Sequence, residues 1–189
     1  MTDDDPPIVY QLVDEDRQAW HAGESEWYGR TYLNASSIGI EIVNAGPRGD
    51  GWEPYPDSQI EAVIALVKDI VTRHQIQARN VVGHSDIAPG RKQDPGPAFP
   101  WKRLADAGVG RWYDEAKAQG LTERYRRTGL PPMGVIQEKL RRAGYAAPDT
   151  GTLDAATRKV IRSFQMHYRP ARYDGEPDAE TVAILDALH

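Results

Sequence analysis

Two residues of the kind that bind metal ions, His84 and Asp94, stand in one segment rich in glycine and proline. His84 follows the aliphatic pair Val81-Val82, and Asp94 lies in a stretch stiffened by proline, so their side chains could meet from two backbone directions. A zinc ion with three protein ligands and one open position supplies a water nucleophile and stabilises an oxyanion. Together, these residue types are suited to hydrolysis of an amide bond.

Lys92 and Glu41 have the chemistry to complete such a site. Lys92, two residues before Asp94, could face a substrate carbonyl and stabilise its negative charge. Glu41 is the one carboxylate in an aliphatic run, where burial is costly unless the group has a partner or a task. It could take a proton from the metal-bound water and pass it to the leaving nitrogen.

Each of these residues also has an ordinary explanation. A histidine after an aliphatic strand often makes structural hydrogen bonds, and Lys92 beside Asp94 could be a surface ion pair. Asp86 is a rival ligand, because two-residue spacing places it on the same face as His84. Spacing alone leaves these alternatives open.

The elements that would position these residues indicate an α/β fold, with a mixed β-sheet flanked by helices. Ile8–Val13 and Ser37–Asn44 are predicted strands, the second with alternating isoleucines on one face. An apolar stripe predicts a helix from Asp57 or Ser58 to about His74. Val81-Val82 predicts a short buried strand. The stretch from Pro89 to Pro100, with four prolines and two glycines, predicts an ordered loop.

The composition changes after Trp112. Residues 114–132 are polar and end in Pro131-Pro132, which indicates a linker that contains some helix. Residues 133–189 carry apolar positions at helical spacing in three runs, separated by turn signals, and predict a small all-α domain of three helices. About fifty residues form a core adequate for a binding module but small for an enzyme.

Bulk properties exclude several classes of protein. The 189 residues are 40% hydrophobic and 27% charged, as expected for a globular chain, and no apolar run is long enough to span a membrane. The net charge of −5 argues against a nucleic-acid partner. There are no cysteines, so disulfides and thiolate ligands are excluded. The acidic start, Met1 to Pro7, is not a signal peptide.

Several separated segments carry a specific resemblance. They are Tyr10-Gln11-Leu12-Val13 followed by Ala19-Trp20-His21-Ala22-Gly23, then Asn34 followed by Ser36-Ser37-Ile38-Gly39-Ile40-Glu41, then Val81-Val82-Gly83, the run from His84 to Pro97, and Phe99-Pro100-Trp101. In this order they resemble the zinc-dependent N-acetylmuramoyl-L-alanine amidases of the type 2 amidase family, over roughly residues 8 to 112. The resemblance implies hydrolysis of the amide bond between N-acetylmuramic acid and L-alanine in peptidoglycan or muropeptides.

The resemblance also implies roles for individual residues. It makes His84 and Asp94 ligands of Zn²⁺, Glu41 the catalytic acid/base, Lys92 the group that stabilises the tetrahedral intermediate, and Trp20, His21 and Asn34 substrate-binding residues. Asp86 would organise the loop without touching the metal.

The C-terminal unit resembles the three-helix peptidoglycan-binding domain. The matching residues are Ile136-Gln137-Glu138-Lys139-Leu140, Gly144-Tyr145, Thr157, Phe164-Gln165, Asp174-Gly175 and Thr181. This divides the chain into an amidase domain (1–113), a linker (114–132) and a wall-binding domain (133–189). Tethering to an insoluble polymer raises the local substrate concentration. The combination indicates a protein of the periplasm or cell envelope.

The sequence departs from the family at one ligand. The family's zinc site takes its first histidine from a strand upstream of Tyr10-Gln11-Leu12-Val13, and this sequence contains no such residue. The predicted amidase domain is therefore incomplete, either because the chain is part of a longer protein or because it is a short form. The alternative function is a peptidoglycan-binding protein with weak or no catalysis. A zinc peptidase that cuts within the stem peptide is a third possibility.

Overall fold

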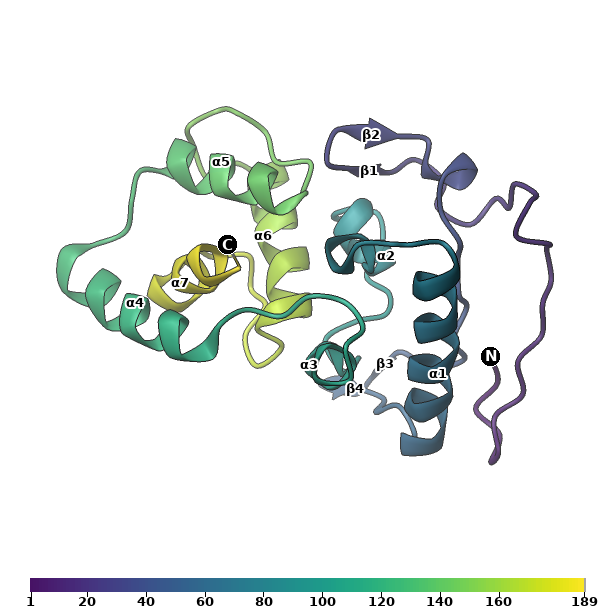
Figure 1. Cartoon of the computed structure of the whole chain (residues 1–189). Coiled ribbons are helices and arrows are strands. Elements are labelled where there is room, and N and C mark those ends of the chain that lie inside the picture. The colour runs from purple at the N-terminus through teal and green to yellow at the C-terminus, as the bar shows by residue number, and fades with distance from the viewer. Residues whose placement is uncertain (189) are drawn as a thin grey trace.

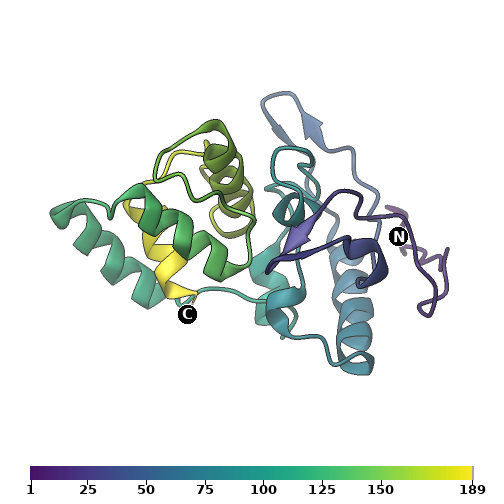
Figure 2. The same cartoon turned by 90° about the horizontal axis from the view of Figure 1, so that it is seen from above.

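The computed structural model describes residues 1–188, which form two groups of elements lying side by side (Figures 1 and 2). The first group contains two β-ribbons, three α-helices and two short 3-10 helices (η1 and η2), and the second contains four α-helices. In chain order the elements are β1 (Glu26–Trp27), β2 (Arg30–Thr31), η1 (Leu33–Ala35), β3 (Pro47–Arg48), β4 (Gly51–Trp52), α1 (Asp57–Arg73), η2 (Ala78–Asn80), α2 (His84–Ile87), α3 (Trp101–Asp106), α4 (Glu115–Thr128), α5 (Met133–Ala143), α6 (Ala155–Tyr168) and α7 (Ala179–Ala187).

The fold class is as predicted, small β elements with helices followed by a helical unit, but the strands differ in detail. In residues 1–188, β1 pairs with β2 and β3 with β4 as antiparallel ribbons. Ile8–Val13, Ser37–Asn44 and Val81-Val82, predicted as strands, carry no strand assignment, so the predicted mixed sheet is not formed in the described chain. An alternating pattern needs a neighbouring strand to pair its backbone, and local sequence does not supply one.

Helix α1 agrees with the apolar stripe that predicted it. Ile60, Val63, Val67 and Ile70 are buried, and the first three pack in a cluster with Phe99 and with residues of α3. The N-terminal segment crosses the outside of this helix (Figure 1), held where Glu15 forms ion pairs with Arg73 and His74. In the described chain, no helix is both long and apolar enough to cross a membrane.

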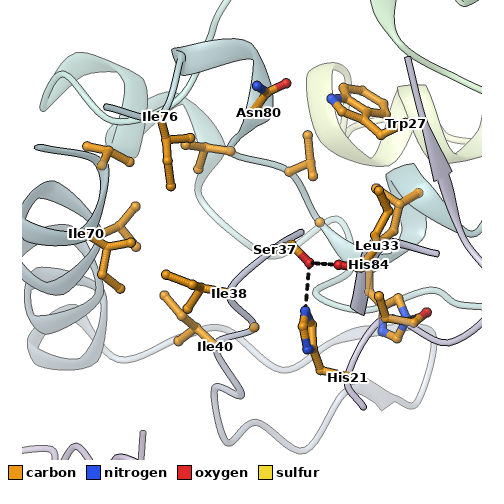
Figure 3. Close-up of a pocket in the computed structure, with 18 of the residues that line it drawn as sticks. His21, Trp27, Leu33, Ser37, Ile38, Ile40, Ile70, Ile76, Asn80 and His84 are labelled. Atoms are coloured by element: carbon orange, nitrogen blue, oxygen red, sulfur yellow. Dashed lines mark hydrogen bonds between the residues drawn. The ribbon is translucent and has the colours of Figure 1, made fainter. Parts of the chain in front are cut away.

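A cavity of about 790 Å³ lies beside α1 and interrupts this core. Ile38 and Ile40 line it on one side, and Ile70 and Ile76 line it on another (Figure 3). Ile38 and Ile40 belong to the alternating run that a neighbouring strand of the predicted sheet would have covered. The apolar face of residues 38–42 is therefore only partly covered, because Ile40 and Ile42 touch the cluster of α1 but also line the cavity.

The C-terminal helices are tightly packed and use the same polar device twice. Gln137 and Gln165 are both fully buried. Each accepts the backbone N–H of a turn glycine, Gly151 or Gly175, at 2.9 or 2.8 Å, and donates to the threonine hydroxyl of the next helix. Because a buried amide needs its full set of partners, each glutamine fixes the turn and the helix that follow it.

The segment expected to be a linker contains a long helix that belongs with the C-terminal unit. Helix α4 packs against α7, where the Tyr125 hydroxyl donates to Asp186 and the Asp114 N–H donates to the Ala187 carbonyl. What connects the two groups of elements is therefore the short stretch between α3 and α4 (Figure 2).

The contrast between a packed core and an open one can be measured. Phe164 is fully buried, so Phe164→Ala should lower the free energy of unfolding by about 3–5 kcal/mol. Ile40 is half-buried and lines the cavity, so Ile40→Ala removes fewer packing contacts and should cost clearly less than Phe164→Ala. Urea unfolding of both variants compares them. Equal losses would show that the cavity beside α1 is filled in solution.

Candidate active site

The structure brings the two predicted zinc ligands, His84 and Asp94, into contact. His84 is the first residue of α2, and its Nδ1 lies 3.0 Å from Asp94 Oδ2. The backbone holds the two segments together as well, because the Ser85 N–H donates to the Asp94 carbonyl at 2.8 Å. The other ring nitrogen of His84, Nε2, lies 3.0 Å from the Ala22 carbonyl. A ligand histidine is commonly oriented by such a bond, and a metal bound at Nδ1 would take the place of the contact with Asp94.

Arg91 fastens this loop to the segment that follows His21. Its guanidinium donates to the carbonyls of Ala22 and Glu24, each at 2.6 Å through Nη2. A planar guanidinium suits several acceptors in a fixed geometry, so it positions Ala22 as the partner of His84. Sequence reasoning did not single out Arg91, although it lies between His84 and Asp94.

The electrostatics around Asp94 favour its ionised form. The hydrogen bond from His84 is the main cause that lowers the pKa of Asp94, burial opposes it, and the positive charge of Lys92 adds to the lowering. Lys92 is thus close enough to act on the same carboxylate, on a loop that turns where Ala88 accepts the Lys92 N–H. An ionised Asp94 is the form that can bind a cation.

Glu41 and His21 line the same cavity as His84 and Asp94. His21 Nε2 lies 2.8 Å from the Ser37 hydroxyl (Figure 3), and its buried Nδ1 has no hydrogen-bond partner among the described residues. Gly39 is packed against the imidazole, since a Cβ there would lie 2.6 Å from the ring. The predicted acid/base and one predicted substrate residue therefore share a cavity with the ligand pair.

The other two predicted substrate residues are placed differently. Trp20 is 84% exposed and is not part of the cavity lining. Asn34 uses its side-chain oxygen to accept the N–H groups of Ala22 and Gly23, at 2.7 and 3.2 Å. Asn34 therefore holds Ala22, which lines the cavity, whereas the Trp20 side chain is exposed to solvent.

Asp86 has its hydrogen-bonding capacity committed elsewhere. Its side chain is 1% exposed, and its oxygens accept from the Gly83 N–H and the Tyr145 hydroxyl and lie 2.7 Å from His167 Nδ1. The rival assignment as a metal ligand is therefore wrong. Sequence reasoning placed His167 in a separate domain, because nothing in the local pattern signals a contact across 81 positions.

The donors present match zinc in kind but fall short in number. One imidazole and one carboxylate converge, whereas a zinc site normally has three protein ligands. Across residues 1–188, no group of three histidine, aspartate or glutamate side chains is arranged to hold a metal ion. Among the described residues, His84 and Asp94 are donors of the kind that zinc prefers, without a third protein ligand beside them.

Comparison with known proteins identifies the family. Residues 1–97 match the model of the N-acetylmuramoyl-L-alanine amidase family, and residues 131–185 match that of the peptidoglycan binding domain. The chain belongs to the N-acetylmuramoyl-L-alanine amidase family. It is 46% identical over 188 residues to the N-acetylmuramoyl-L-alanine amidase AmiD of Escherichia coli, covering 96% of this chain and 67% of AmiD. It is 42% identical over 96 residues to the 1,6-anhydro-N-acetylmuramyl-L-alanine amidase AmpD of the same organism, covering 51% of this chain and 50% of AmpD.

Solved structures of this amidase family share the fold. AmpDh3 of Pseudomonas aeruginosa, in complex with anhydromuramic pentapeptide, superposes with a TM-score of 0.89 at 50% identity, covering 95% of this chain and 71% of that one. E. coli AmiD, in complex with anhydro-N-acetylmuramic acid-L-Ala-D-γ-Glu-L-Lys, gives a TM-score of 0.84 at 44% identity, covering 96% and 72%. The two-unit arrangement is therefore shared with these relatives.

The contact between His84 and Asp94 predicts a pH dependence in the metal-free chain. The folded pKa of Asp94 lies below its unfolded value. The contact therefore adds stability above the unfolded pKa and loses it as the pH falls through the folded pKa. In His84→Ala the pKa of Asp94 should rise toward its ordinary value, because the main lowering bond is gone. NMR titration of the Asp94 carboxyl measures both values, and an unchanged pKa in the variant would contradict the contact.

Proposed function

We propose that this chain hydrolyses the amide bond between N-acetylmuramic acid and L-alanine in muropeptides or peptidoglycan. The observation that carries the proposal is the His84–Asp94 pair at the wall of a cavity that Glu41 also lines. The family supports the reaction class, and the relatives solved with anhydromuramic peptides support the class of substrate. The chain spans 67% of the length of AmiD and about half of the length of AmpD. The activity of those whole proteins is therefore proposed for this chain and is not taken from the match.

The chain's own residues divide the chemistry between them. Glu41 accepts a proton from the attacking water and delivers it to the departing amide nitrogen, which makes the nitrogen a better leaving group. The Lys92 ammonium stabilises the negative charge that develops on the carbonyl oxygen. His84 and Asp94 would hold Zn²⁺, which would supply polarisation of the carbonyl and activation of water at that site. Trp20 and His21 would contact the substrate.

The reaction is tested by its products. Mass spectrometry of a muropeptide digest, with zinc in excess, should show the intact stem peptide separated from the sugar. Glu41→Gln should lower the rate by about 10²–10⁴-fold and Lys92→Ala by about 10²–10³-fold. The exposed residues Glu123 and Lys68 provide controls, because Glu123→Gln and Lys68→Ala leave the cavity untouched. Shortened stem peptides would instead identify a peptidase.

The incomplete donor set predicts weak metal binding. Two protein ligands hold zinc less firmly than three, so the purified 189-residue chain should lose zinc on dialysis and show low amidase activity. Metal analysis before and after dialysis, beside a rate measurement, checks this. Stoichiometric zinc retained through dialysis, together with an ordinary rate, would show the expectation to be wrong.

A second function follows from the same observation. If the ligand pair holds zinc too weakly for turnover, the chain acts as a peptidoglycan-binding protein through residues 131–185, which match the binding-domain family. Binding to purified cell walls without released products would favour this function. Either activity places the protein where peptidoglycan is found, in the periplasm or cell envelope, and cell fractionation tests that placement.

A further inference from the structure

The contact between the two units is centred on Asp86, two residues after His84. Of the three groups that bond its buried carboxylate, only the Gly83 N–H belongs to the same loop. The Tyr145 hydroxyl, which donates at 2.7 Å, and His167 Nδ1, also at 2.7 Å, come from the C-terminal helical unit. A buried carboxylate is tolerated only with such partners, so the helical unit completes the environment of the turn that begins at His84.

The two donors are themselves held rigidly. The His167 ring stacks on Trp101 and on Tyr168, with centroids 4.0 Å apart in both cases. Tyr145 is 2% exposed and packs edge to face against Trp27. Burial, and then the negative charge of Asp86, raise the pKa of Tyr145 well above its ordinary value, so the hydroxyl remains a donor.

Helix α6 also covers the loop itself. Gly90 has φ +76°, and a Cβ there would lie 2.3 Å from Cδ of Lys159 in α6. Nearby, Trp27 lies against Gly144, and the Tyr28 N–H donates to the Gly144 carbonyl at 2.9 Å. One apolar cluster includes Ala22, Trp27 and Leu33 together with the core of the helical unit. The loop is thus covered on one side by α6, and Tyr145 reaches it from the segment that follows α5.

We propose that Tyr145 and His167 are positioning residues of the amidase site, which act by holding Asp86 and so fix the turn that presents His84 to Asp94. This rests on the proposed function only in treating His84 and Asp94 as the ligand pair. The helical unit then does more than tether the enzyme to its polymer, because it contributes to the geometry of the site. A tether alone would affect action on insoluble walls and leave a small soluble substrate unaffected.

The test uses the full chain and the variant Tyr145→Phe, with Tyr125→Phe as the matched control. Both variants lose one hydroxyl that donates to a carboxylate, but the partner of Tyr125 is Asp186, inside the helical unit. The Ser85 amide is the reporter, since its hydrogen bond to the Asp94 carbonyl joins the residue after His84 to Asp94. Its hydrogen exchange should be at least about tenfold faster in Tyr145→Phe only, while the core amides of Leu140 and Ile161 stay protected.

Zinc alone, added in a chelator competition, gives the second reading. Groups that orient ligands from outside the metal's direct contacts typically change affinity by about 10–100-fold, and that loss is expected for Tyr145→Phe but not for Tyr125→Phe. His167→Asn, which keeps an N–H donor near Asp86, should retain more Ser85 protection than His167→Leu. With zinc in excess, Tyr145→Phe should slow hydrolysis of a soluble muropeptide through kcat more than through KM.

The outcomes are separable. Unchanged Ser85 exchange in both Tyr145→Phe and His167→Leu would overturn the positioning role, as would equal acceleration in the loop and the helical core. If the unmodified chain binds no zinc and releases no product, the proposed function fails, yet the exchange comparison still decides whether Tyr145 and His167 hold the loop.

Discussion

The buried carboxylate of Asp86 is the constraint on which the rest of the structure depends. Removing such a group from water is costly, and the cost is offset only by donors that are themselves buried and aligned. Here two of the three donors, Tyr145 and His167, belong to the helical unit, 59 and 81 residues further along the chain, so the buried carboxylate ties the loop to that unit. The stacking of His167 on Trp101 makes that docking specific, because it sets the ring plane as well as the position.

This constraint changes the meaning of the two-domain organisation. A catalytic domain and a wall-binding domain joined by a flexible linker would share few buried contacts. In this chain, α4 is folded onto α7, and the apolar cluster of the helical unit extends through Trp27 into the first unit. The residues that match the two families therefore share one continuous apolar core. We expect the amidase part and the helical part to unfold in a single cooperative transition.

The sequence predicted the features that local periodicity controls. The stripe of α1 and the three C-terminal helices follow from apolar spacing and turn residues, and the Asp154 and Asp178 caps explain where two of the helices begin. The prediction of strands was wrong in detail, because strand pairing depends on residues far away in the sequence. The isoleucines of residues 38–42 indicated an apolar face but not a strand to pair with. His84, Asp94 and Lys92 were proposed from their motif, whereas Tyr145 and His167 could not be linked to this loop from the sequence, since only the tertiary fold brings them to Asp86.

The loop that carries His84 and Asp94 is packed against α6 on one side and borders the cavity on the other. On the side of α6, the loop from Gly83 to Asp94 is fixed by Tyr145, His167 and the packing of Lys159 on Gly90. On the side of α1, His84 and Asp94 line the wall of the cavity of about 790 Å³. A rigid loop keeps its ligands in register even where the neighbouring core is open. Under the proposed function, a substrate would approach from the cavity side, which Glu41 and His21 also line.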